Sequence, residues 1–145
     1  MPSLSARRSE AFPIQARPLW DRCSAARSGL SRKTGQRLCD LAVLATSAAF
    51  AVPVGELIAR SRRSPYVAFA RQSAMYIAHV CFGLSFSEVG HSFGCDRTTA
   101  AHACRLVEER RDDPAVDAVL ASLESACATV RTRLAAPVAA KRVRS

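Results

Sequence analysis

The sequence predicts an all-α protein, a small helical domain of about six helices. Glycine is rare, with six residues in 145, and aromatic residues make up only 6% of the chain, which is unusual for an all-β domain. Apolar residues recur at helical spacing in several segments between residues 35 and 134. Gly, Pro and Asp residues of the kind that end or begin helices separate these segments.

Positive charge is concentrated at the two ends of the chain. The net charge is +9, but residues 1–33 hold seven Lys and Arg against two acidic residues, and residues 137–145 add three basic residues and no acid. We therefore expect a disordered basic N-terminal tail over 1–33, a domain over 34–134 and a basic C-terminal tail over 135–145. Such tails suit a polyanion because neutralised phosphates release counterions, although they also serve simply as solubility aids.

The first half of the domain contains two expected helices. Leucines and alanines at helical spacing predict the first over Gly35–Ala51. Pro53 ends this helix or begins the next, a short one over Val54–Arg60. The basic sequence Ser61-Arg62-Arg63-Ser64-Pro65 is then expected to form a loop, because Pro65 disfavours helical backbone at the residue before it.

The middle of the domain contains the clearest periodicity. Ala74, Ile77, Ala78 and Cys81 form an apolar stripe, which predicts a helix over Ala68–Phe82 that ends at Gly83.

Three further helices complete the domain. The sequence Ser85-Phe86-Ser87-Glu88 is a capping box and predicts a two-turn helix over Phe86–Phe93. Gly94-Cys95 is a tight turn, and Asp96 caps a longer helix from Arg97 to about Arg110. Asp113 caps a last helix that runs to about Leu134. A short helix, a tight turn and a longer helix have the spacing of a helix-turn-helix.

Candidate binding residues lie at the start of the second helix of this motif. Asp96-Arg97-Thr98-Thr99 places short or forked polar side chains where a recognition helix meets DNA. Arg97 has the geometry to bind guanine O6 and N7, and Thr98 and Thr99 suit a thymine methyl group or a phosphate. The alternative is that these residues only cap the helix, since many helical hairpins do not bind DNA.

Other classes of site have weaker support. The six cysteines form no C-x-x-C pair, so we expect small apolar core residues rather than a zinc site, and no cofactor. His102 and Cys104 are two residues apart on one helix and point to different faces. The sequence shows neither paired carboxylates nor a nucleophile with a plausible base, so we expect neither an enzyme nor a small-molecule substrate. The longest apolar stretch, Leu41–Gly55, is interrupted by polar residues and Pro53, so no membrane span is expected.

The region from about 50 to 130 resembles domain IV, the C-terminal DNA-binding domain of the bacterial chromosomal replication initiator DnaA. The matching residues are Arg71-Gln72 followed by Ala74-Met75, then Leu84-Ser85-Phe86-Ser87-Glu88-Val89-Gly90, Ser92-Phe93-Gly94, Asp96-Arg97-Thr98-Thr99 and His102-Ala103-Cys104-Arg105. The last two pieces are the most specific, because the family signature reads Asp-His-Thr-Thr, two residues, then His-Ala-Cys.

The resemblance implies a role for each matching residue. Arg63, beside Arg62 in the basic loop, corresponds to an arginine that enters the minor groove, and Arg71 and Gln72 correspond to residues that contact phosphates. The four residues that begin at Asp96 correspond to those at the major groove. The candidate DNA-binding residues are Arg62, Arg63, Arg71, Gln72, Ser87, Asp96, Arg97, Thr98 and Thr99.

The chain also departs from the family pattern. Arg97 replaces a histidine, and the turn before Asp96 is one residue shorter than the usual Gly-x-x-Asp. Pro65 and Phe69 stand where the family is often basic, and His79 replaces a lysine that contacts the DNA backbone. The chain has no G-x-x-x-x-G-K-[ST] phosphate loop, so we expect a DNA-binding module that acts as a stand-alone protein, without the initiator's ATPase domain.

The expected function is sequence-specific binding of double-stranded DNA at sites that resemble DnaA boxes, linked to the initiation or regulation of chromosome replication in the bacterial cytoplasm and nucleoid. The alternatives are a transcription regulator at unrelated sites and a protein-interaction module that has lost DNA binding. The replication initiator or another protein is a candidate partner for the N-terminal segment. There, Leu19-Trp20 is either a short docking element or an inert apolar pair.

Overall fold

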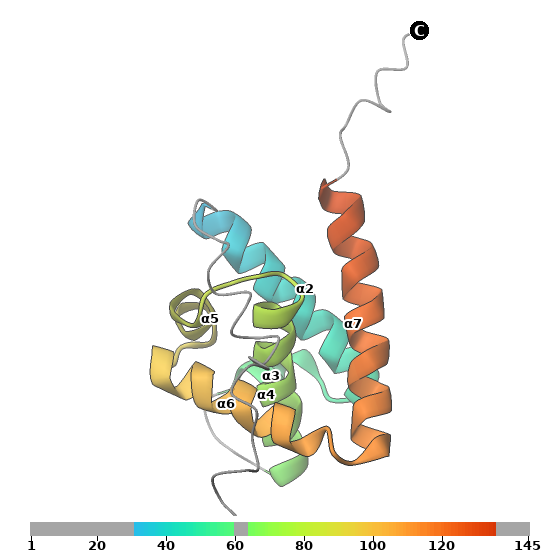
Figure 1. Ribbon diagram of the computed structural model, residues 1–145. Coiled ribbons are helices and arrows are strands. Elements are labelled where there is room, and N and C mark those ends of the chain that lie inside the picture. Colours follow the sequence, from blue (N-terminus) through green and yellow to red (C-terminus); the bar gives the residue numbers. More distant parts are fainter. Residues whose placement is uncertain (1–30, 60–63, 136–145) are drawn as a thin grey trace, which may run out of the picture.

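The computed structural model describes residues 31–59 and 64–135, and every regular element in these two ranges is a helix (Figure 1). The helices are α2 (Arg32–Phe50), α3 (Val54–Ile58), α4 (Pro65–Val80), α5 (Phe86–Phe93), α6 (Arg97–Arg110) and α7 (Pro114–Ala135). The expected all-α class with about six helices is confirmed. Most of the two expected tails, and the loop residues Arg62 and Arg63, lie outside the described residues.

Helix α4 lies at the centre of the domain and contacts each of the other five described helices. Every residue from Ser73 to His79 is buried. The buried surface of α4 is therefore wider than the single apolar stripe expected from the sequence. Three alanines of α4, Ala70, Ala74 and Ala78, are 0% exposed. Small side chains on several faces allow neighbouring helices to approach α4 from several directions, which a single stripe does not indicate.

His79 belongs to this buried segment rather than to a surface that could meet DNA. It is 0% exposed, its Nδ1 lies 2.5 Å from the carbonyl oxygen of Leu84, and its ring stacks on Phe86 at a centroid distance of 4.1 Å. A buried ring at this position cannot make the DNA-backbone contact that the resemblance assigns to a lysine. Phe69 is also buried, between the ring of Phe50 and the guanidinium group of Arg110.

Two helices begin three residues earlier than expected, because a serine caps each of them. The Ser31 hydroxyl accepts a hydrogen bond from the Thr34 amide at 3.2 Å, and α2 begins at Arg32 instead of Gly35. Ser64 has extended backbone and accepts from the Val67 amide at 3.1 Å, so Pro65 becomes the first residue of α4. Proline is favourable there, since the first amide of a helix has no intrahelical acceptor.

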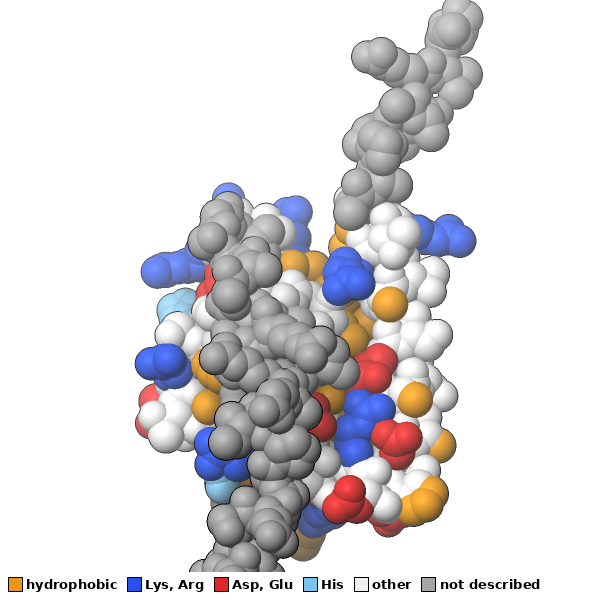
Figure 2. All heavy atoms as spheres, viewed as in Figure 1, with side chains coloured by type: hydrophobic (Ala, Val, Ile, Leu, Met, Phe, Trp, Pro, Cys, Tyr) orange, Lys and Arg blue, Asp and Glu red, His pale blue; other side chains and the backbone are white. Residues whose placement is uncertain are grey.

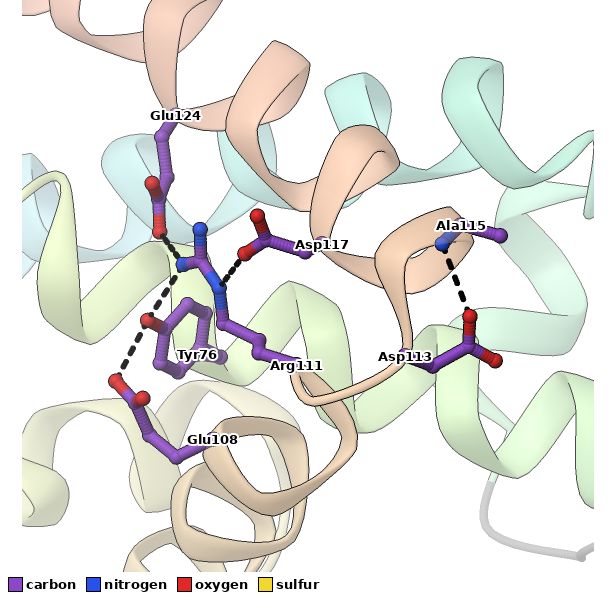
Figure 3. Close-up of polar contacts among 7 residues, drawn as sticks. All are labelled: Tyr76, Glu108, Arg111, Asp113, Ala115, Asp117 and Glu124. Carbon is purple, nitrogen blue, oxygen red and sulfur yellow. Dashed lines mark hydrogen bonds and ion pairs between the residues drawn. The ribbon is translucent and has the colours of Figure 1, made fainter.

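The joint between α6 and α7 is held by one arginine (Figure 3). Arg111 follows the last residue of α6, and its Nε donates to Asp117 Oδ1 of α7 at 2.6 Å. Its Nη1 pairs with Glu124 and lies 3.0 Å from the Tyr76 hydroxyl, which itself donates to Glu108 at 2.8 Å. Burial raises the pKa of Tyr76, so this hydroxyl keeps its proton and bridges α4 to α6. The network fixes α7 against the central helix.

Four of the six cysteines are core residues, as expected. Cys39, Cys81, Cys104 and Cys127 are buried and free, and Cys95 is half-buried. Burial raises the pKa of Cys39 to about 11 and that of Cys104 to about 12, so both remain uncharged thiols at neutral pH. Within the described ranges, no cluster of three His, Cys, Asp or Glu side chains has the arrangement of a metal site.

None of the described helices combines the length and the apolar character needed to cross a bilayer.

Candidate nucleic-acid interface

Helices α5 and α6 form the helix-turn-helix, with the bounds that the sequence predicts. The capping box at the start of α5 is complete. The Glu88 amide donates to the Ser85 hydroxyl at 3.1 Å, and the Ser85 amide donates to the Glu88 carboxylate at 2.7 Å. Buried Val89 and Phe93 give α5 an apolar face, and α6 packs beside it with buried Ala100 and Cys104. The angle between the two helices is therefore set by a small apolar interface.

The turn between these helices is closed by backbone hydrogen bonds. Gly94 has φ 71°, a conformation that glycine adopts without steric cost. The Cys95 amide donates to the Gly90 carbonyl at 2.9 Å and the Gly94 amide to that of His91 at 3.4 Å, the pattern of a Schellman motif. A Cβ atom on Gly90 would lie 2.7 Å from the Cys95 carbonyl oxygen. The shortened turn thus packs directly onto the backbone of α5.

The start of α6 presents the expected binding residues to solvent. Asp96 accepts a hydrogen bond from the Thr99 amide at 2.7 Å, so it caps the helix, and the bonds from Thr99 lower the pKa of this carboxyl group. All four residues from Asp96 to Thr99 are exposed, while Ala100 behind them is buried. The cap and an outward-facing polar surface therefore occur together at the same helix end.

Arg71 has a structural contact that the sequence does not reveal. Its Nη1 donates to the carbonyl oxygen of Ala59 at 2.6 Å, and its Nη2 donates to that of Phe93 at 2.9 Å. The guanidinium carbon also lies 5.9 Å from the centroid of the Phe93 ring. Arg71 therefore braces the segment after α3 and the end of α5 against α4. A guanidinium group has five N–H donors, so this brace leaves donors for another ligand.

Three candidate residues surround one hollow of about 240 Å³. Arg71 and Gln72 of α4 line it from one side, and Cys95 and Thr99 line it from the turn and α6. Glu56 lines the same hollow and brings a negative charge to it, a neighbour that the sequence analysis missed. The structure therefore brings the expected phosphate contacts close to the start of the expected recognition helix.

The remaining candidates lie elsewhere. Ser87 is exposed on α5 and faces a separate groove that it shares with Ser31 and Arg32 of α2. Arg62 and Arg63, the expected minor-groove arm, lie outside the described residues. In Figure 2, Lys and Arg side chains lie along the edge that the start of α2, α5 and the start of α6 form, whereas most visible acidic side chains gather near the α6–α7 joint.

The close approach at Gly90 predicts a sensitive position. Gly90→Ala should lower the free energy of unfolding by about 1–3 kcal/mol, because the added methyl group meets backbone that cannot move away cheaply. Urea denaturation, monitored by circular dichroism, measures the change in the free energy of unfolding. Gly55→Ala is the matched control: it also replaces a helical glycine, but nothing lies within 4 Å of its Cβ, so it should be neutral or stabilising. Equal effects of the two substitutions would refute the steric explanation.

Comparison with known families agrees with this geometry. Residues 40–107 match the family model described as the bacterial dnaA protein helix-turn-helix. The match begins within α2 and ends within α6, so it includes α3, the central helix α4 and the whole of α5. The resemblance expected from the motif at residues 96–105 is confirmed: residues 40–107 of this chain are similar to the helix-turn-helix domain of bacterial DnaA proteins.

Proposed function

We propose that this chain binds double-stranded DNA sequence-specifically, at sites that resemble DnaA boxes. The observation that carries the proposal is the start of α6, where Arg97, Thr98 and Thr99 are exposed on a helix end that Asp96 caps. In a helix-turn-helix, the residues at this position of the second helix contact base edges in the major groove. The match of residues 40–107 to the model of the bacterial dnaA helix-turn-helix supports the same function.

In the proposed complex, each element has one task. Helix α6 enters the major groove, where Arg97 binds the O6 and N7 atoms of a guanine and the two threonines contact a thymine methyl group or a phosphate. Helix α5 crosses the DNA backbone with Ser87 on its exposed side. Arg71 and Gln72 contact phosphates next to α6, and the resemblance assigns the minor groove to Arg62 and Arg63.

The role that follows is regulation or initiation of chromosome replication in the bacterial cytoplasm, where the protein would compete with or assist the initiator at shared sites. A protein partner bound through the N-terminal segment belongs to the same proposal. Arg97 in place of the family histidine favours a second candidate, a transcription regulator that reads a different site. Both functions would use the same fold and the same residues. They differ only in the DNA sequence that is bound.

Selection of binding sites from random duplex DNA tests the proposal. Recovery of sequences that resemble the DnaA box supports the replication role, and recovery of an unrelated sequence supports the transcription regulator. Failure to bind any duplex at low salt would overturn both and favour a protein-interaction module. Repeating the selection with Arg97→His asks whether this side chain sets the difference, since only the side chain changes while the short turn is kept.

Arg97→Ala should weaken binding to the selected site by about 1–3 kcal/mol and relax the preference at one base pair, because a bidentate contact to guanine is lost. Binding to random DNA should change much less. Titration of both duplexes at one fixed salt concentration gives the comparison, and His102→Ala, exposed further along α6, is a control on the same helix. Equal losses on selected and random DNA would contradict base readout by Arg97.

The two roles of Arg71 can be separated with two substitutions. Arg71→Ala should lower the salt dependence of DNA binding by about one unit of the log–log slope and lower the unfolding free energy by about 1.5–3 kcal/mol, because both a phosphate contact and the carbonyl brace are lost.

Arg71→Lys keeps the charge but cannot bridge the same two carbonyls as a fork, so stability should fall while the salt slope is retained. Binding is measured well below each variant's melting temperature. An unchanged slope in Arg71→Ala would mean that Arg71 is only a brace.

A further inference from the structure

An apolar groove of about 730 Å³ lies between α2 and the C-terminal half of α7, and nothing in the described chain fills it. Leu134, at the end of the apolar stripe of α7, and Arg131 form one wall. Leu120, Leu123 and Cys127 are buried, but the stripe continues to Val130 and Leu134, which are 37% and 62% exposed. In Figure 1 the last turns of α7 diverge from α2, whose first turns lie at the upper left. The stripe is therefore longer than the surface that covers it.

A second stripe on α2 forms the opposite wall. Leu38 and Leu41 are half-buried, Leu44 is 56% exposed, and Phe82 lies at the base of the groove. The residues that line this groove are too few for a stable interface between two copies of the chain, because each partner in such an interface normally contributes 20–30 residues. A short apolar segment is a better match to the groove.

We propose that this groove binds the chain's own N-terminal segment, with Leu19-Trp20 as the anchoring pair. The segment enters α2 at Ser31, and α2 itself forms one wall of the groove. Trp20 is eleven residues before Ser31, a stretch that reaches up to about 40 Å when extended. The α2 wall from Thr34 to Leu44 is about 15 Å long, so Trp20 can reach every part of it.

The chemistry of the segment and of the groove also agree. Trp20 is the only tryptophan, and an indole ring offers the largest apolar surface of any side chain while its N–H can remain at a polar rim. That rim carries charges of both signs, with Arg37 and Asp40 from α2. Asp21-Arg22, which directly follows Trp20, carries charges of both signs too.

The C-terminal segment is a weaker candidate for the same groove. It leaves α7 next to Leu134, but residues 136–145 contain only two side chains larger than proline that are apolar, both valines. Residues 1–30 contain seven large apolar side chains. Docking of the N-terminal segment would leave the DNA-binding surface free, since the groove shares no lining residue with the hollow at Arg71 and Thr99.

The single tryptophan makes the test direct. In the full 145-residue chain, Trp20 emission should lie at shorter wavelength, and acrylamide should quench it several-fold less, than in the same chain unfolded in urea. Leu44→Asp and Leu134→Asp each place a charge on a groove wall and should move both values toward those of the unfolded chain. Their side chains are largely exposed, so the fold should persist, which far-ultraviolet circular dichroism checks. Ile58→Asp, 55% exposed on α3 outside the groove, is the control and should leave Trp20 protected.

Three results would overturn the proposal. One is a native Trp20 as accessible to acrylamide as in urea. Another is a protected Trp20 that neither groove substitution releases, which would mean that it binds elsewhere. The third is protection that increases with protein concentration together with the sedimentation coefficient, which would identify a second copy as the occupant. None of these readouts involves DNA, so the docking and the proposed DNA binding can fail independently.

Discussion

Close packing around α4 is the constraint on which the rest of the structure depends. Each of the other five described helices contacts α4, and the alanines at positions 70, 74 and 78 are completely buried. A methyl group lets a neighbouring backbone approach closely, and a larger side chain at any of these positions would push a helix outward. Because α6 packs across α4, the orientation of the expected recognition helix is set by the core and not by the turn alone.

Arg71 is the polar counterpart of this packing. It belongs to α4, but its guanidinium group holds the backbone after α3 and at the end of α5, next to the turn that leads into α6. The resemblance to DnaA implies only a phosphate contact for this arginine. The structure adds a reason to keep an arginine there without DNA, since a fork that donates to two carbonyls at once cannot be replaced by a lysine. The contacts to two carbonyls and the proposed phosphate contact would thus depend on the same side chain.

The sequence predicted α5 and α6 with correct bounds because their start and stop signals are local. The capping box, Gly94 and Asp96 each act within a few residues. Helices α2 and α4 begin three residues before the expected positions because Ser31 and Ser64 cap them, although the apolar periodicity begins later in each segment. The periodicity of α4 indicates one apolar face, whereas helices cover it on several faces. The buried surface of α4 is therefore larger than the periodicity predicts. The brace at Arg71 and the tight contact at Gly90 join segments that only the fold brings together.

At the site, two interpretations of the start of α6 need not compete. The sequence left open whether Asp96-Arg97-Thr98-Thr99 caps a helix or binds DNA, and the cap is present in the structure. It occupies one carboxylate oxygen of Asp96 and the backbone amide of Thr99, but the Arg97 side chain stays exposed. A firm cap favours readout, because a frayed helix end would have to be ordered at the moment of binding, at a cost in entropy. The cap therefore prepares the surface on which the proposed function depends.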